Sequence, residues 1–264
     1  MGILSVFGKD RSLAFELTQR EVLGRYRGAS FGLLWSLISP FLMLLVYTLA
    51  FGFIMKGRWP GSSGSTTDFA LILFAGLTVH GFFAECFIRA PQLIVGNTSY
   101  VKRVVFPLDI LVWSMSFSAL FHLVMNLVVL LLLYVCVKGS IHPTAALLPL
   151  VLAPLVILTV GVGWALSALG VYLRDIGQIA GVIATAMLFL SSAIIPVESV
   201  PESYRLVFEL NPLTFIINQV REVVIWGRLP DWAGLGIYTV IACVVAVIGH
   251  RIFTKLRVGF ADVL

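Results

Sequence analysis

Charged side chains are scarce in this sequence. Asp, Glu, Lys and Arg make up 12% of the 264 residues, whereas hydrophobic residues make up 59% and the mean hydropathy is +1.02. A soluble domain carries charge on about a quarter of its residues, because polar groups must cover its surface. The composition therefore excludes an ordinary soluble domain. It indicates an integral membrane protein, which we expect to be all-α.

Cysteine is also scarce. Cys86, Cys136 and Cys243 fall within apolar stretches, are odd in number and lack the spacing of metal ligands. We interpret them as small buried hydrophobic side chains rather than as a disulfide framework. Acidic residues show no metal-ligand spacing within the apolar stretches either, so no metal site is predicted.

The amino terminus lacks the pattern of a cleaved signal peptide. The apolar run 3–7 is too short, and Lys9, Asp10 and Arg11 follow it. We therefore expect the first membrane span to serve as the insertion signal.

Long uncharged stretches are what the sequence has in abundance. The first extends from Gly28 to Met55, which at about 1.5 Å per residue is long enough to cross a hydrocarbon core of about 30 Å. Basic residues precede it, and Trp35 lies near them at the expected headgroup level. Together with five later stretches, this predicts about six transmembrane helices in one domain, 1–264. The predicted spans cover residues 33–55, 69–88, 108–137, 145–173, 179–195 and 232–253.

Two further segments are predicted to be helical without spanning. Residues 7–26 mix charges with apolar residues at helical spacing, which is typical of an amphipathic helix in the membrane interface or, equally, of a solvated helical tail. Residues 196–230 contain four prolines and predict two short helices broken at Asn211-Pro212. Because the second is apolar yet too short to span, we expect a re-entrant pair on the outer side.

The distribution of Lys and Arg predicts the orientation. With the amino terminus in the cytoplasm, twelve of the 18 basic residues lie on the cytoplasmic side, which favours cytoplasmic termini at both ends. The net charge of +5 arises beside the spans, where membrane lipids explain it better than nucleic acid does. No nucleic-acid partner is predicted.

Four motifs in order carry a resemblance to a known family. They are residues 18–40 (TQREVLGRYRGASFGLLWSLISP) with 42–47 (LMLLVY), 100–108 (YVKRVVFPL), 172–176 (YLRDI) and 211–214 (NPLT). The chain resembles polysaccharide exporter permeases of the ABC-2 type, above all the O-antigen and teichoic-acid members. The resemblance covers nearly the whole chain.

The resemblance implies a homodimer in the bacterial inner membrane that binds two copies of a separate nucleotide-binding ATPase subunit and moves an undecaprenyl-diphosphate-linked glycan. The sequence has no G-x-x-x-x-G-K-[ST] phosphate loop, so ATP and Mg would bind the partner and no cofactor would bind this chain. By position, the resemblance places the ATPase-coupling contacts at Asn97, Tyr100, Lys102, Arg103, Arg174, Asp175 and Ile176. A plain cytoplasmic turn is the alternative for Arg174 and Asp175.

Residue chemistry suggests a path for such a substrate. A lipid diphosphate needs cationic donors near the headgroup level. The candidates are Arg25, Arg27, Lys102 and Arg103, which could instead serve only to orient the chain. Sugar rings move over flat apolar faces. The candidate channel-lining residues are Trp35, Tyr47, Phe51 and Phe189, with lipid-facing or core packing as the alternative.

Polar residues inside the spans allow a second interpretation, an ion-coupled secondary transporter. His80, His122 and Asn126 are expected to make hydrogen bonds between helices, and Glu85 is expected to pair with Arg89. A proton relay through the first three would instead indicate an ion-coupled secondary transporter. An exporter of a small amphiphile with the same architecture is a further alternative.

An intramembrane protease is not indicated. Ser167 lacks the expected glycine two residues before it, and His250 is predicted far in depth from His122. No catalytic residue is therefore predicted, and we expect a permease rather than an enzyme.

Overall fold

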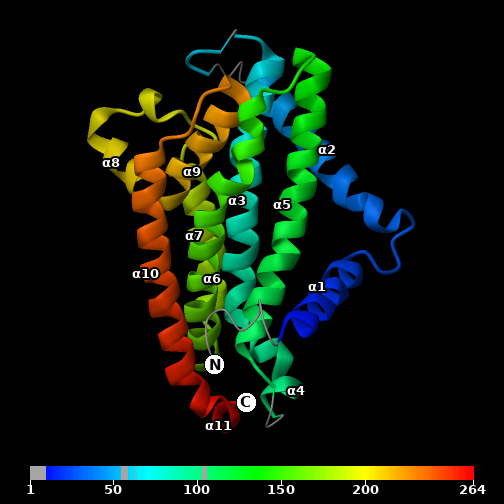
Figure 1. Cartoon of the computed structure of the whole chain (residues 1–264), viewed down its shortest axis with the longest axis vertical. Helices are drawn as coiled ribbons and strands as arrows, with labels where there is room; N and C mark the ends of the chain where they lie inside the picture. Colours follow the sequence, from blue (N-terminus) through cyan, green and yellow to red (C-terminus); the bar gives the residue numbers. More distant parts are fainter. Residues whose placement is uncertain (1–9, 55–58, 63, 103–105) are drawn as a thin grey trace.

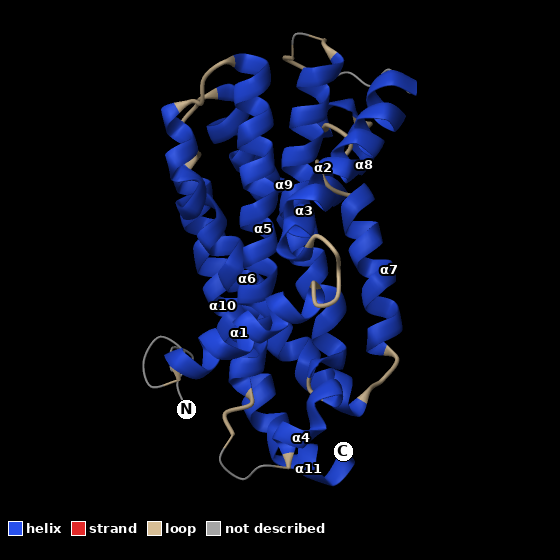
Figure 2. Cartoon of the chain, turned by 90° about the vertical axis from the view of Figure 1, so that its right-hand side faces the viewer, coloured by secondary structure: helices blue, strands red, loops and turns tan. Residues whose placement is uncertain are grey.

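The protein is an all-α integral membrane protein. The computed structural model describes residues 10–54, 59–62, 64–102 and 106–264, and every regular element within these residues is helical (Figures 1 and 2). Five helical runs are long and apolar enough to cross a membrane. They are Gly32–Ile54, Thr66–Leu93 (α3), Asp109–Lys138 (α5), Pro143–Tyr172 and Trp232–Val263.

Local signals begin and end several of these helices. Ser65 caps α3 by accepting a hydrogen bond from the backbone N–H of Asp68 at 3.1 Å. Asp231 does the same for α10 (Trp232–Leu256), accepting from Gly234. Gly139 ends α5 with a φ of +82°, a left-handed conformation that glycine adopts without strain.

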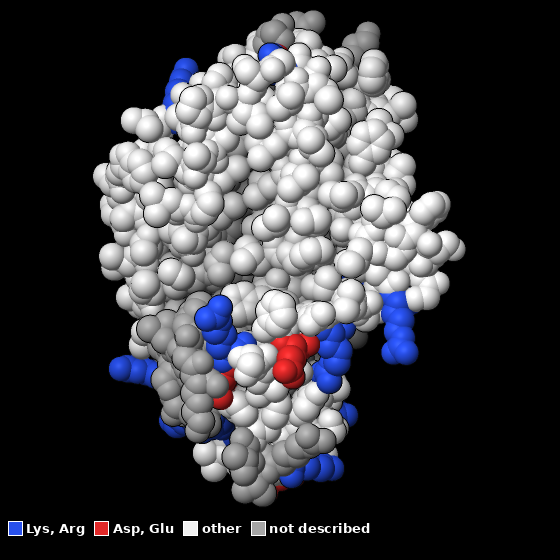
Figure 3. Space-filling model, turned by 45° about the vertical axis from the view of Figure 1, so that its right-hand side comes forward, with Lys and Arg blue, Asp and Glu red and all other residues white. Residues whose placement is uncertain are grey.

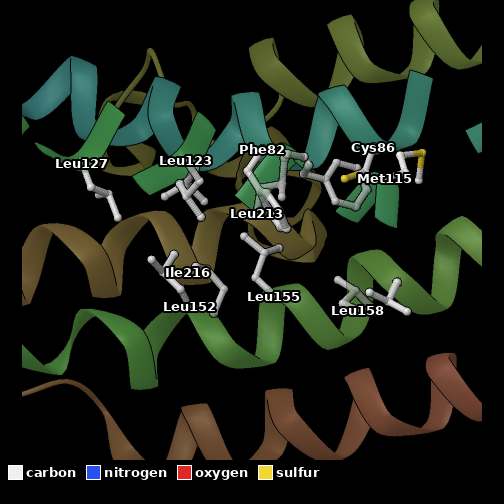
Figure 4. Close-up of a cluster of buried hydrophobic side chains, with 14 of the residues drawn as sticks. Phe82, Cys86, Met115, Leu123, Leu127, Leu152, Leu155, Leu158, Leu213 and Ile216 are labelled. Carbon is white, nitrogen blue, oxygen red and sulfur yellow. The ribbon is translucent and has the colours of Figure 1, made fainter. Parts of the chain in front are cut away.

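The core forms around α3, the most buried span. Helix α3 packs against α5, α6 (Leu148–Tyr172), α7 (Ile176–Phe189) and α9 (Pro212–Arg221). Figure 4 shows apolar side chains of α3, α5, α6 and α9 meeting in one layer. Labelled examples are Phe82, Leu123, Leu155 and Leu213.

Helix α10 covers the opposite side of α6 through a close backbone contact. A Cβ atom added at Gly249 would collide with the backbone of Gly161, so glycine at both positions lets the two helices approach. Small residues at such crossings are typical of membrane helix packing.

The first span packs loosely against α3 and α5. It consists of a 3-10 turn Gly32–Leu34, α2 (Trp35–Tyr47) and a π-helical turn Thr48–Ile54. Only Ser36 and Leu44 of α2 are buried, and Figure 1 shows α2 splayed from α5. Its outward face is apolar, with exposed Phe41, Leu42, Leu45 and Val46.

A short helix lies beside the lower part of α5 in Figure 1. Helix α1 (Arg11–Arg25) packs against α5 and buries Ala14, Leu17 and Val22 along one face. The predicted helix 7–26 is therefore present from Arg11, and residues 7–9 lie outside the described part of the chain.

Helix α7 covers part of the fifth predicted span, 179–195. Helix α7 ends at Phe189 and has 14 residues, about 21 Å, which is shorter than a hydrocarbon core of about 30 Å. The carbonyl oxygens of Ser192 and Ala193 accept hydrogen bonds from the Arg221 side chain instead of from a continuing helix.

The break at Asn211-Pro212 occurs as the sequence predicts. Helix α8 (Glu202–Leu210) ends there and α9 begins, followed by a π-helical turn Glu222–Trp226. The Asn211 side chain accepts from the Leu213 N–H and donates to the carbonyls of Met187 and Leu190, so it fastens the helix pair to the end of α7. The re-entrant depth of this pair in a membrane stays a prediction.

Charges gather toward the ends of the molecule. Figure 3 shows a broad uncharged surface with Lys, Arg, Asp and Glu concentrated below it. Asp68 pairs with Lys138 at 2.7 Å at one end of α3 and α5, and Asp109 with Arg257 at 3.5 Å near the other. We call these the α8 end and the α4 end, the latter carrying α4 (Thr98–Val101) and α11 (Phe260–Val263) (Figure 1).

The expected burial of the cysteines is correct for one of the three. Cys86 is buried in α3, whereas Cys136 and Cys243 are exposed. The latter two lie on outward faces of α5 and α10, where an apolar position in a span faces the surroundings rather than the core.

Candidate functional site

A groove of about 490 Å³ lies between α2, α3 and α5. Trp35 and Tyr47 of α2 form part of one wall, and His80, His122 and Asn126 contribute polar groups from α3 and α5. The volume is within the range of about 300–1,000 Å³ for small-molecule sites. The groove therefore combines aromatic faces with a few hydrogen-bonding groups.

Charged residues gather at one part of this groove. We define the charged cluster as Glu21, Arg25, Glu85, Arg89 and His122. Arg25 Nη1 donates to Glu85 Oε1 at 2.7 Å, and Arg89 Nη1 donates to the same oxygen at 3.2 Å. His122 Nδ1 lies 3.0 Å from Glu85 Oε2, and Arg89 Nη2 donates to Glu21 Oε2 at 2.8 Å. Glu85 is the centre of the cluster.

The charged cluster joins three helices. Glu21 and Arg25 come from α1, Glu85 and Arg89 from α3, and His122 from α5. The Arg25 side chain is 52% exposed, whereas that of Glu85 is 15% exposed. The Arg25 side chain is therefore more accessible than the inner contacts of the cluster. Arg25 is the member of the cluster best placed to exchange its partner for another anion.

Tyr26 borders the same groove just after α1. Burial raises the pKa of its phenol, against a lowering by the Arg25 charge and with a smaller increase from Glu85. The phenol therefore stays neutral at physiological pH and offers a hydrogen bond rather than a charge.

Residues 13–225, most of the chain, match the family model described as ABC-2 type transporter. The chain belongs to the ABC-2 type transporter family. This confirms the resemblance seen in the sequence. Members of the family are transport permease subunits rather than enzymes, and they pair with a nucleotide-binding ATPase subunit in ABC exporters.

Curated relatives cover nearly the full length of this ABC-2 chain. It is 27% identical over 254 residues to the O-antigen export system permease protein RfbA of Myxococcus xanthus, covering 96% of this chain and 95% of the relative. It is 24% identical over 251 residues to the protein of the same description from Klebsiella pneumoniae, covering 94% and 93%. The polysialic acid transport protein KpsM of Escherichia coli is 25% identical over 237 residues, covering 89% of each chain.

Two of the four candidate channel-lining aromatic residues line the groove, and two do not. Trp35 and Tyr47 line the groove. Phe51 packs near Tyr47, with ring centroids 6.2 Å apart, and Phe189 is 51% exposed on α7. Neither of these two is among the described residues that line the groove.

The four basic candidates for diphosphate contact also differ in position. Arg25 is in the charged cluster, whereas Arg27 is exposed beyond the end of α1. Lys102 is exposed directly after α4, and Arg103 lies outside the described residues. Only Arg25 lines the groove among those that the structure describes.

The candidate ATPase-coupling residues lie in two short connections. Asn97 donates from Nδ2 to the Leu93 carbonyl at 2.9 Å and so closes the end of α3. Tyr100 on α4 accepts a hydrogen bond from Arg20 of α1 at 2.8 Å, which links α4 to α1. Lys102 follows α4.

The second connection joins α6 to α7. Arg174 and Asp175 are exposed in the turn, and Ile176 begins α7. The backbone N–H groups of Ile176 and Gly177 donate to the carbonyls of Leu173 and Arg174 within this turn.

Most predicted polar contacts inside the spans are present in the ABC-2 chain. His80 Nε2 lies 2.9 Å from the Ala184 carbonyl and links α3 to α7, and His122 links α5 to α3 through Glu85. Glu85 pairs with Arg89 as its spacing predicted. Sequence reasoning missed Glu21, because its contact with Arg89 joins residues 68 positions apart and depends on how α1 docks.

Proposed function

We propose that this chain is the transmembrane subunit of an ATP-driven exporter that carries an undecaprenyl-diphosphate-linked, O-antigen-like polysaccharide from the cytoplasmic side across the bacterial inner membrane. The chain would act as a homodimer with both termini in the cytoplasm. The groove that joins Arg25 to Trp35 and Tyr47 is the observation that carries this proposal. The names of the relatives, which refer to O-antigen export and polysialic acid transport, support it.

Arg25 would receive the diphosphate. Its side chain is half exposed, and its Nη1 lies 2.7 Å from one carboxylate oxygen of Glu85 and 2.9 Å from His122 Nδ1. A diphosphate offers several oxygens to the planar guanidinium fork and carries more charge than one carboxylate. Arrival of the substrate would thus exchange Glu85 for phosphate at Arg25, while Arg89 and His122 keep Glu85 satisfied.

The glycan would then pass along the aromatic side of the groove. Trp35 and Tyr47 present flat apolar faces, and Asn126 and His80 lie among polar groups that can exchange hydrogen bonds with hydroxyls. The undecaprenyl chain would remain in lipid beside the exposed apolar face of α2. We propose that the first and fifth spans, including Phe51 and Phe189, move to widen this path.

The ATPase subunits would act on the α4 end. ATP and Mg would bind those subunits, and closure of the motor would push on two connections. The proposed contacts are Asn97, Tyr100, Lys102, Arg103, Arg174, Asp175 and Ile176. The Arg20–Tyr100 hydrogen bond would pass movement of α4 to α1, and the charged cluster would pass it on to α3 and α5.

Cells lacking this chain provide the test. We expect glycan to be synthesised but to stain only after permeabilisation, and the wild-type chain to restore surface staining. Arg25→Ala is expected to insert in the membrane without restoring export, because the diphosphate loses its cationic donor. Arg251→Ala, an exposed arginine on α10 outside the groove, is the matched control and should export normally. Unchanged surface glycan in cells without the chain would rule out polysaccharide export.

An exporter of a small amphiphile is the second candidate. The groove has the volume of a small-molecule site and lies beside a loosely covered α2, so a single amphiphile could enter it from the side. Normal surface glycan together with loss of amphiphile efflux in cells without the chain would favour this candidate.

A further inference from the structure

A second hollow of about 290 Å³ lies at the α8 end, opposite α4. It is formed by the segment 59–61, the 3-10 turn Val197–Ser199, α9 and the π-helical turn after it. The lining of this hollow differs from that of the groove, because two tryptophans lie beside amide, carboxylate and guanidinium groups. The side chains used below are Trp59, Glu198, Asn218, Arg221, Glu222, Trp226 and Arg228.

Arg221 is the most unusual of these residues. Its side chain is 2% exposed, and its guanidinium donates to the carbonyls of Ile72, Ser192 and Ala193 at 2.7–3.0 Å. It also lies 4.1 Å from the centroid of the Trp59 ring. Within the described part of the chain, no carboxylate lies within ion-pair distance of Arg221. Three of its five N–H groups make these hydrogen bonds, and the residue forms part of the wall of the hollow.

A third hollow of about 240 Å³ shares Gly61 and Trp226 with this one. It is lined by Tyr134 and by the Asp68–Lys138 ion pair, whose N···O distance is 2.7 Å. Trp226 therefore lines both hollows. Together they form a strip at the α8 end that carries aromatic rings and paired charges along its length.

We propose that this strip is a saccharide-binding site for sugar units of the polysaccharide, and this inference rests on the proposed function. Aromatic faces suit the C–H faces of a pyranose ring, while planar amide, carboxylate and guanidinium groups suit pairs of neighbouring hydroxyls. The first hollow has two arginines and two glutamates, so its charges balance. That balance favours a sugar over a phosphate, which would need an excess of positive charge. Each hollow is near the lower limit of ligand sites and suits one sugar unit at a time.

Such a site would hold the polysaccharide as it emerges from the protein. The site lies at the α8 end, whereas His122 of the charged cluster lies near the middle of α5, so a glycan that enters from the α4 end reaches the site after the groove. A sugar unit bound there opposes backward movement while the ATPase resets. The site therefore adds direction to transport, separately from recognition of the diphosphate at Arg25.

Calorimetric titration tests the site on the full-length chain in lipid nanodiscs. The probe is a set of short oligosaccharides released by mild acid from the surface polysaccharide of the bacterium that encodes the chain, and it carries no diphosphate. Trp226→Leu removes an aromatic face, and Asn218→Ala removes an amide with little risk to folding. Trp232→Leu, a half-exposed tryptophan at the start of α10 outside both hollows, is the matched control. Each variant is also tested for export in cells that lack the chain.

The expected result is weaker binding by about tenfold in both strip variants, which corresponds to about 1.4 kcal/mol, and unchanged binding in Trp232→Leu. Equal binding by all four proteins, or no binding by a wild-type chain that does restore surface glycan, would overturn the saccharide site and leave the proposed function intact. A wild-type chain that fails to restore surface glycan would contradict the proposed function. Loss of oligosaccharide binding in the strip variants would, even then, support the site.

Discussion

Glu85 is the residue on which the charged cluster depends. Its two oxygens contact Arg25, Arg89 and His122, while only 15% of its side chain is exposed. In the proposed mechanism, Arg25 would exchange this internal carboxylate for the incoming diphosphate. The carboxylate would then be both a structural partner of Arg25 and a competitor of the substrate.

This competition predicts opposite effects for two substitutions. Glu85→Gln removes the negative charge while keeping the side-chain volume, so Arg25 is released and a diphosphate should bind more tightly, by about tenfold. Arg25→Ala should weaken binding by a similar factor. The measurement is the affinity of farnesyl diphosphate for the chain in nanodiscs, with farnesol as the uncharged control. A weaker affinity in both variants would show that Glu85 does not compete for Arg25.

At the scale of the element, α6 and α10 cross closely because the glycines at the crossing have no side chains. A Cβ atom at Gly249 meets the backbone of Gly161, which cannot move as a flexible side chain can. Gly236, on the same helix α10, has no neighbouring heavy atom within 4 Å of such a Cβ. Gly249 and Gly236 therefore provide a matched pair of positions for substitution by alanine.

We expect Gly249→Ala to destabilise the folded chain by about 1–3 kcal/mol, because the helices must separate to admit the methyl group. Gly236→Ala should be neutral or slightly stabilising, since alanine favours helix over glycine. Thermal unfolding in one detergent, followed by the loss of monodisperse protein, measures both. Equal melting temperatures for the two variants would contradict the close crossing.

The sequence predicts those helix boundaries that depend on local chemistry. Asn211-Pro212 separates α8 from α9 because proline and an asparagine cap act within a few residues. The end of α7 depends instead on Arg221, about thirty positions further along, which binds the carbonyls of Ser192 and Ala193. Hydropathy alone could not reveal that contact, and so the predicted span continued to residue 195.

The contacts of the candidate site also divide into those that sequence spacing predicts and those that depend on tertiary packing. The spacing of Glu85 and Arg89 predicted their pairing on one helix face. The docking of α1, which brings Glu21 and Arg25 to α3, depends on tertiary packing against α5. Sequence chemistry therefore identified Arg25 as a basic candidate, but not its partner.

At the scale of the whole molecule, α2 is the span with the least cover. Its apolar side chains face outward, while its inner face borders the groove. A channel between two copies of the chain would bring the α2 helices near the interface. Helix α10 also has an exposed apolar face, but it lies on the far side of α6 from α3.

This arrangement predicts where two copies can be linked. In a chain without its native cysteines, Val46→Cys on α2 should form a disulfide-linked dimer in native membranes under mild oxidation. Val244→Cys on α10, whose exposed fraction of 52% is similar to the 57% of Val46, is the control and should remain monomeric on a denaturing gel. Linkage at Val244 but not at Val46 would place the interface on α10 instead.

Transport in proteoliposomes tests the central claim most directly. The chain and its ATPase partner would be reconstituted together with a radiolabelled undecaprenyl-diphosphate oligosaccharide, and the label crossing the membrane would be followed with and without ATP. The account predicts ATP-dependent movement that is lost with Arg25→Ala and kept with Arg251→Ala. Movement of a small amphiphile but not of the lipid-linked oligosaccharide, or equal movement with Arg25→Ala, would contradict it.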